Sequence, residues 1–140
     1  MMGLRSATTN FNYGIDFLLQ SLSGANFPAV CANLVLSRGA SPRGDRLLTR
    51  PYLMLDRLLT DQSGRTHRVR IGVIGLLPPQ VAIWDHKHLH GSATTRDILA
   101  SARAWLPEMR EGGADLIIAL AHSGIGCVLG NLRGEKKKGG

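Results

Sequence analysis

Apolar residues recur at helical spacing near the start of the chain and then form a continuous run. Over residues 12–22 they fall every three or four positions, which predicts a short helix that Gly24 can close. Residues 29–36 are mostly apolar and follow Pro28, so they predict a buried strand. Residues 37–50 are rich in Ser, Gly, Pro and Arg, which predicts a loop.

Two further apolar runs, Tyr52–Thr60 and residues 66–77, predict a β-hairpin. The turn between them is Asp61-Gln62-Ser63-Gly64, in which Gly64 suits a positive φ. The second run is apolar enough for a central strand. Pro78-Pro79 ends it, because proline cannot donate a hydrogen bond to a neighbouring strand.

A second helix is predicted after a loop over residues 80–92. Thr94 or Thr95 is expected to cap it, with Asp97 near its positive end, and it should run to about Glu111. Its apolar face comprises Ile98, Ala102, Trp105 and Met109. Pro107 lies within this pattern, so we expect a kink or an early end there.

Gly112 and Gly113 should stop this helix, and residues 114–121 then form another apolar strand that ends at His122. The order of strand, hairpin, helix and strand predicts an α/β fold with a layered αββα architecture.

The composition is that of an ordinary soluble domain and excludes several classes of protein. The chain has 17 basic and 10 acidic residues, a net charge of +7, but the basic residues are dispersed and aromatic residues make up only 5%. We therefore expect no nucleic-acid partner. The apolar runs are too short to cross a bilayer, so we expect no membrane partner either. Cys31 and Cys127 are too few for a disulfide framework.

Four stretches together carry a resemblance to a known family. They begin at Phe11 (FNYGIDFL), Phe27 (FPAVCAN), Ile71 (IGVIG, followed by PPQ and WD) and Gly113 (GADLIIALAHSG). In this order and spacing they resemble the bacterial 2′,3′-cyclic-nucleotide 2′-phosphodiesterase/3′-nucleotidases, which are calcineurin-like metallophosphoesterases. The resemblance covers residues 11–125.

The resemblance implies a partial αββα sandwich and a hydrolase that uses two divalent metal ions on a nucleotide substrate. Two such ions neutralise the phosphate and activate a hydroxide. The family supplies metal ligands from an Asp-x-His, a Gly-Asp, a Gly-Asn-His-Glu, a lone His and a Gly-His-x-His. Only the lone histidine has a match here, which is His122.

The segment before Phe11 departs from the family pattern. The family has Gly-Asn-His-Glu there, whereas this chain has Ala7-Thr8-Thr9-Asn10, so Thr9 stands in place of the catalytic histidine. A threonine hydroxyl cannot replace imidazole as a proton donor near neutral pH. Residues 6–10 can be encoded TCG GCA ACC ACG AAT. Moving the reading frame one nucleotide upstream, so that codons start at the third nucleotide of this string, gives GGC AAC CAC GAA, which encodes Gly-Asn-His-Glu. One hypothesis is an out-of-frame translation of the true motif, and the alternative is ordinary divergence.

Three other groups of residues are candidate sites. His86, His88 and His90 alternate along one segment and could hold zinc, although an exposed polar loop is the simpler interpretation. Gly72-x-x-Gly75 is not followed by a helix, so it indicates close packing and not a phosphate cradle. Ser123 lacks the sequence pattern of a nucleophilic serine, so we do not expect a serine hydrolase.

The sequence is therefore interpreted as a fragment of a phosphoesterase domain that is inactive on its own. Residues 1–10 are an out-of-frame or diverged lead-in, 11–125 the domain fragment, and 126–140 a disordered basic tail that holds Lys136, Lys137 and Lys138. The parent family is periplasmic, but residues 1–10 show no signal-peptide pattern, so this chain would be cytoplasmic. Strand edges without neighbours would invite aggregation or pairing. The alternatives are a diverged, non-catalytic binding or scaffold domain and a small histidine-based zinc protein.

Overall fold

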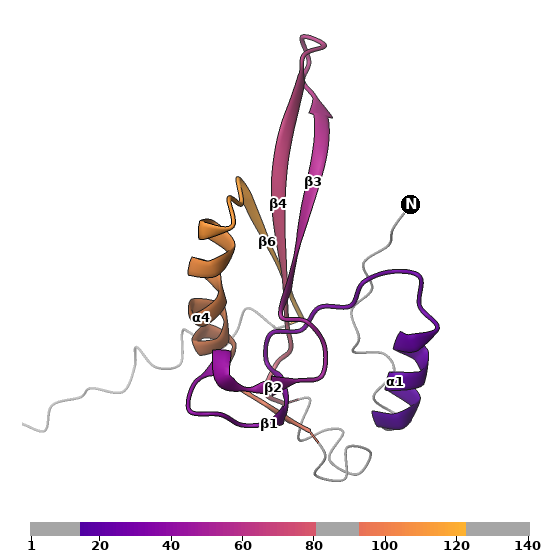
Figure 1. Ribbon diagram of the computed structural model, residues 1–140, viewed down its shortest axis with the longest axis vertical. Helices are drawn as coiled ribbons and strands as arrows, with labels where there is room; N and C mark the ends of the chain where they lie inside the picture. Colours follow the sequence, from indigo (N-terminus) through magenta and orange to yellow (C-terminus); the bar gives the residue numbers. More distant parts are fainter. Residues whose placement is uncertain (1–14, 81–92, 123–140) are drawn as a thin grey trace, which may run out of the picture.

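The computed structural model describes residues 15–80 and 93–122 of the chain (Figure 1). The helices are α1 (Ile15–Ser23), the 3-10 helix η2 (Pro42–Gly44) and α4 (Ile98–Glu111). The strands are β1 (Leu34–Ser37), β2 (Arg46–Leu47), β3 (Tyr52–Thr60), β4 (Thr66–Leu76), β5 (Thr94–Thr95) and β6 (Leu116–Ala121). They form two three-stranded sheets, and this mixture of helix and sheet confirms the predicted α/β class.

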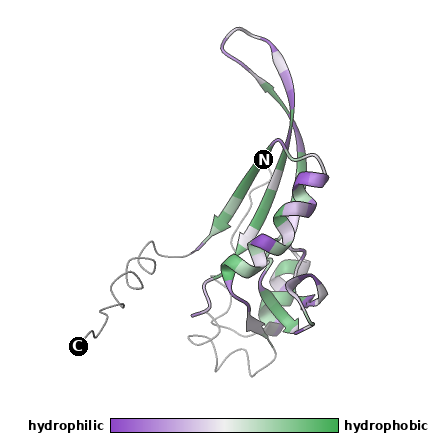
Figure 2. Ribbon diagram, turned by 90° about the vertical axis from the view of Figure 1, so that its left-hand side faces the viewer, coloured by the Kyte–Doolittle hydropathy of each residue, from purple (hydrophilic) through white to green (hydrophobic). Residues whose placement is uncertain are grey.

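The larger sheet has the strand order β3-β4-β6 and contains the predicted hairpin. β3 and β4 are antiparallel from the pair Tyr52–Ile74 to the pair Thr60–Thr66, and Gly64 in the turn has a φ of 81°. β6 runs parallel to β4. The outer half of the hairpin projects well beyond the rest of the molecule (Figure 1), and its hydrophilic tip contrasts with the apolar inner strands (Figure 2).

The smaller sheet, with the order β2-β1-β5, corrects two of the sequence predictions. The strand expected over residues 29–36 is confined to Leu34–Ser37. The preceding backbone bonds two different segments, since the Cys31 N–H donates to Arg50 and the Ala32 N–H to Gly75, so no continuous ladder forms there. The loop expected over residues 37–50 contains η2 and β2.

The helix α4 begins later than its sequence indicated and ends at Glu111, as predicted. Asp97 is the N-cap, and its carboxylate accepts a hydrogen bond of 2.8 Å from the Ala100 N–H. The expectation that Thr94 or Thr95 caps this helix was wrong, because both residues pair with β1 as strand β5. An early end at Pro107 was also wrong: the helix runs through this residue to Glu111, and Gly113, with a φ of 82°, follows its end. Neither α1 nor α4 is long and apolar enough to span a membrane.

Packing of α4 against one face of the larger sheet forms one of the two apolar clusters. Met109 of α4 is fully buried against Ile74 and Leu76 of β4. Burial of a side chain of this size contributes about 1.5–3 kcal/mol. The packing explains why the helix passes through Pro107, since Met109 lies in the turn that follows it and anchors the helix to the sheet.

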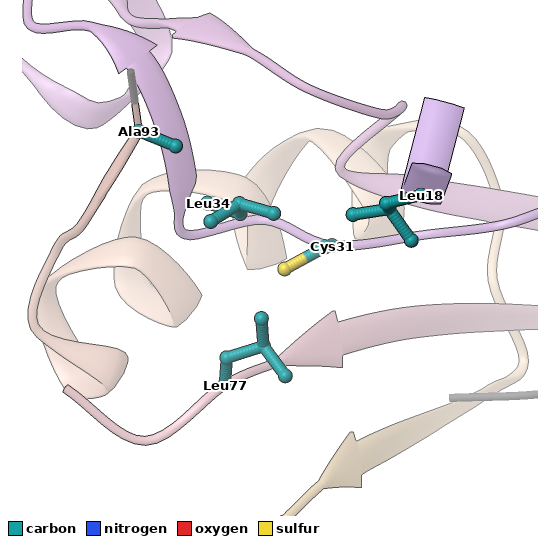
Figure 3. Close-up of a cluster of buried hydrophobic side chains, with 5 residues drawn as sticks. All are labelled: Leu18, Cys31, Leu34, Leu77 and Ala93. Atoms are coloured by element: carbon teal, nitrogen blue, oxygen red, sulfur yellow. The ribbon is translucent and has the colours of Figure 1, made fainter. Parts of the chain in front are cut away.

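A second cluster joins α1 to β1 and to the end of β4. It consists of Leu18, Cys31, Leu34, Leu77 and Ala93, whose side chains lie toward one another (Figure 3). Leu77 enters this cluster directly after β4 ends. The cluster therefore brings α1 and the smaller sheet to the edge of the larger sheet where the functional residues were expected.

The face of the larger sheet opposite α4 is apolar but poorly covered. Ile117 packs on the α4 side, so its neighbours along β6 point the other way. Leu116, Ile118 and Leu120 remain 50%, 39% and 37% exposed on that face. An apolar strip of this kind has the character of an interface.

Candidate functional site

The strands β4 and β6 end side by side, and His122 follows the second of them. Their register runs from the pair Ile71–Leu116 to the pair Leu76–Ala121, so the carboxyl ends of both strands meet at one edge of the sheet. The His122 N–H donates to the carbonyl oxygen of Leu76 at 3.3 Å, which extends the pairing by one residue. The carboxyl edge of parallel strands is the usual place for ligand-binding residues in open α/β sheets.

Asn33 lies fully buried next to this edge and uses its whole carboxamide. Its Nδ2 donates to the carbonyl oxygens of Leu77 at 2.7 Å and of Arg96 at 2.9 Å. Its Oδ1 accepts from the Leu77 N–H at 2.8 Å. This arrangement fixes the orientation of the carboxamide, because exchange of its oxygen and nitrogen would set an acceptor against two carbonyl oxygens.

The Cys31 thiol also donates to Asn33 Oδ1, at 3.6 Å. Burial raises the pKa of this thiol, so it remains a protonated donor at neutral pH. The sequence placed Asn33 in a motif of the family but gave no reason for its presence. The available signal was a single amide residue within an apolar run, because such a residue must find several partners when it is buried.

Thr95 provides a second link from the smaller sheet to the segment after β4. Its hydroxyl donates to the carbonyl oxygen of Pro79 at 3.3 Å, while its own carbonyl accepts from Arg38 at 2.8 Å. Asn33 and Thr95 are both buried polar residues. Together they hold the first residues that leave β4.

An ion pair between Asp45 and Arg96 stabilises the segment that Asn33 contacts. Arg96 donates to Asp45 Oδ1 at 2.7 Å and to the carbonyl oxygen of Gly39 at 2.8 Å. The side chain of Asp45 is only 1% exposed. The hydrogen bond from Arg96 holds the pKa of the Asp45 carboxyl below its usual range, so the pair is charged at neutral pH.

The two histidines that the structure describes are far apart. His67 is the second residue of β4 and pairs with Asp61, with Nε2 and Oδ2 2.8 Å apart. His122 lies beyond the other end of the same strand, about 30 Å away at the rise of an extended chain. They cannot share a metal ion. Within residues 15–80 and 93–122, no group of three His, Cys, Asp or Glu side chains could hold one.

Several candidates from the sequence lie outside the described residues: Thr8, Thr9, His86, His88, His90, Ser123 and the tail over residues 126–140. The interpretation of Gly72-x-x-Gly75 as a packing feature is confirmed. A Cβ atom on Gly72 would approach Met109 Cε to 2.6 Å, and one on Gly75 would lie 2.8 Å from the carbonyl carbon of Val30.

Comparison with known proteins shows that most of this chain is similar to nucleotide phosphoesterases. It is 47% identical over 115 residues to the 2′,3′-cyclic-nucleotide 2′-phosphodiesterase/3′-nucleotidase of Yersinia enterocolitica and 40% identical over 114 residues to that of Haemophilus influenzae. It is 44% identical over 115 residues to the trifunctional nucleotide phosphoesterase YfkN of Bacillus subtilis. No protein-family model matches the chain.

Solved structures give the same relationship. The calcineurin-like phosphoesterase YfkN from Bacillus subtilis superposes with a TM-score of 0.72 at 42% identity, over 84% of this chain and 34% of that one. The matched region of this chain is therefore similar in sequence and fold to calcineurin-like nucleotide phosphoesterases. A putative 5′-nucleotidase from Staphylococcus aureus superposes with a TM-score of 0.61 at 26% identity, over 84% of this chain and 20% of that one.

The similarity to these phosphoesterases covers a limited part of each relative. The matched region is 82% of this chain but only 17% of the Yersinia enterocolitica protein. The Bacillus subtilis YfkN match covers 8% of that protein. The predicted metallophosphoesterase-type α/β fold is confirmed over the matched region.

Proposed function

We propose that this chain is a fragment of a metal-dependent phosphoric-ester hydrolase and is inactive on its own. The observation that supports this most directly is the position of His122. It follows the paired ends of β4 and β6, within a region that is 40–47% identical to nucleotide phosphodiesterase/nucleotidases. A metal-binding imidazole needs a fixed backbone as well as a partner for its second ring nitrogen, and the hydrogen bond from the His122 N–H to Leu76 supplies the fixed backbone.

The family implies two divalent metal ions, and His122 is the residue of this chain that would hold one of them. Imidazole nitrogen suits several divalent transition metals. When bound, a pair of such ions would neutralise the phosphate and activate a hydroxide. The described residues supply no cluster of three donors, so they do not fit a complete dinuclear centre, and we assign no reaction step to them.

The proposed substrates belong to the complete enzyme. The names of its relatives point to 2′,3′-cyclic nucleotides and 3′-nucleotides, and the family resemblance implies a periplasmic location. The contribution of the described residues would be structural: to present His122 at the edge of the sheet and to exclude water from the core beneath it.

Sequencing of the DNA that encodes residues 1–11 and 126–140, with its flanks, tests the fragment proposal. We expect other reading frames to encode Asp-x-His, Gly-Asp and Gly-Asn-His-Glu upstream and Gly-His-x-His downstream. The boundaries proposed from the sequence, at residues 10 and 125, would then mark the changes of frame. Flanks without these motifs would favour a diverged domain.

The diverged domain would be a binding or scaffold protein, and the apolar face opposite α4 favours this second candidate. Its outer strand, β6, is an edge of the sheet in the described chain, and Leu116, Ile118 and Leu120 are exposed on it. Such a surface invites pairing with another chain.

Sedimentation of the wild type and of two lysine variants tests the pairing proposal. Ile118→Lys should reduce self-association, because it places a charge on the apolar face. Leu99→Lys is the matched control, because Leu99 is 55% exposed but lies on α4. Equal sedimentation of all three proteins as monomers would exclude self-pairing.

A further inference from the structure

We propose that Asn33 is a positioning residue, which sets the place of His122 by holding the peptide group that His122 pairs with. Its importance for function rests on the proposed role of His122 as a metal ligand. The positioning itself depends only on contacts between residues of this chain.

A single peptide group connects the two residues. The carbonyl oxygen of Leu76 accepts the His122 N–H at 3.3 Å, and the Leu77 N–H donates to Asn33 Oδ1 at 2.8 Å. The Leu76 carbonyl and the Leu77 N–H belong to the same planar peptide unit. Asn33 therefore holds one end of a rigid plane whose other end fixes the backbone of His122.

The same carboxamide also holds the next peptide unit along the chain. Its Nδ2 donates to the Leu77 carbonyl oxygen at 2.7 Å, so it grips both polar groups of one residue as a neighbouring strand would. β4 has no regular backbone partner for Leu77 in the described chain, since the ladder with β6 ends at the pair Leu76–Ala121. Asn33 supplies this missing partner.

Asn33 is itself anchored on its other side. Its Nδ2 donates to the Arg96 carbonyl oxygen at 2.9 Å, and the Arg96 N–H donates to the Asn33 carbonyl oxygen at 3.0 Å. The guanidinium of Arg96 is fixed by Asp45 and by the carbonyl of Gly39. The smaller sheet is thus a fixed support. The Asn33 side chain connects it to the Leu76–Leu77 peptide group, with which the His122 backbone pairs.

Amide hydrogen exchange in the full chain, read residue by residue by NMR, tests this proposal. In Asn33→Leu, which keeps a side chain of similar size without its hydrogen bonds, the His122 amide should exchange about tenfold faster relative to the slowest amides of β4 and β6. The imidazole resonances of His122 should shift as well. Met109→Ala is the control, because Met109 is also fully buried but lies in the other apolar cluster, which does not include Leu77.

Met109→Ala should lower protection in the strands and at His122 in equal proportion, because it destabilises the fold without touching the cluster that contains Leu77. Loss of protection at His122 in the same proportion in Asn33→Leu would overturn the proposal. If Asn33→Leu does not fold, Asn33→Ser provides a milder test, and an unchanged ratio of His122 to strand protection would again refute it. A failure of His122 to bind any metal would contradict the proposed function but would leave these exchange results unaffected.

Discussion

Substitution of Gly75 by alanine should destabilise the fold at the point where the two sheets meet. The new methyl group would lie 2.8 Å from the carbonyl carbon of Val30 and 3.3 Å from the Cys31 Cα. Both are backbone atoms, and the segment is held by hydrogen bonds from Cys31 to Arg50 at 3.0 Å and from Ala32 to Gly75 at 2.7 Å. The backbone can yield only if these bonds lengthen.

The magnitude follows from three opposing effects. Overpacking of a rigid site costs about 1–3 kcal/mol, and each weakened hydrogen bond adds about 0.5–1.5 kcal/mol. The reduced freedom of the unfolded chain returns about 0.4–1 kcal/mol. We therefore expect Gly75→Ala to lower the free energy of unfolding by about 2 kcal/mol.

Gly72→Ala is the matched control in the same strand. There a Cβ atom would meet Met109 Cε at 2.6 Å and Met54 Sδ at 3.4 Å, which are the flexible ends of side chains. The cost should stay below about 1 kcal/mol, because methionine adapts its rotamers easily. Urea unfolding followed by tryptophan fluorescence would measure both variants, with equal m-values required for the comparison. Gly75→Ala within about 0.5 kcal/mol of the wild type, or Gly72→Ala as the worse variant, would refute this reasoning.

Three further predictions concern the hairpin and α4. The pKa of Asp61 is lowered to about 2, and the largest cause is a hydrogen bond from the Ser63 hydroxyl. The stabilisation of the hairpin by the Asp61 carboxylate is therefore complete above the ordinary pKa of 3.8 and is lost as the pH falls toward 2. An NMR titration midpoint near 4 would contradict this. The hydrogen bond to Glu108 raises the pKa of Tyr52 to about 12. Ultraviolet absorbance should therefore show that Tyr52 ionises at high pH, and Glu108→Gln should lower its pKa toward 10. An unchanged pKa in that variant would count against the contact. Pro107→Ala should raise the free energy of unfolding by about 1–3 kcal/mol, because it restores a donor inside α4; a lower denaturation midpoint would show that the helix requires proline there.

Local chemistry was sufficient to predict the hairpin from the sequence. Tyr52–Thr60 was predicted with its observed bounds because alternation and a Gly-containing turn act over short distances. The smaller sheet was not predicted, since β2 and β5 have two residues each and exist only because β1 lies between them. Pairing between segments so distant in sequence leaves no periodic signal in either one.

The helix α4 shows how packing overrides local preference. Two threonines, Thr94 and Thr95, were predicted as caps, but both pair with β1, and Asp97 is the N-cap. A kink or an early end was expected at Pro107, yet the helix continues to Glu111, because the burial of Met109 outweighs the lost hydrogen bond.

The candidate site was only partly predictable. The position of His122 after an apolar strand was visible in the sequence, because strand and histidine are adjacent. The function of Asn33 was not, since its partners Leu77 and Arg96 lie 44 and 63 residues away. A single sequence does not show which distant backbone groups a buried amide will meet.

Hydrolysis of 2′,3′-cyclic AMP by the purified chain, with manganese or cobalt supplied, tests the central claim most directly. Wild type and His122→Ala would be compared with a metal-only blank, and a complete relative would serve as the positive control. The proposed fragment should show no turnover above the blank in either form, because His122 alone cannot form a dinuclear centre. Metal-dependent turnover by the wild type that His122→Ala abolishes would contradict the claim and would show that this chain is a working enzyme.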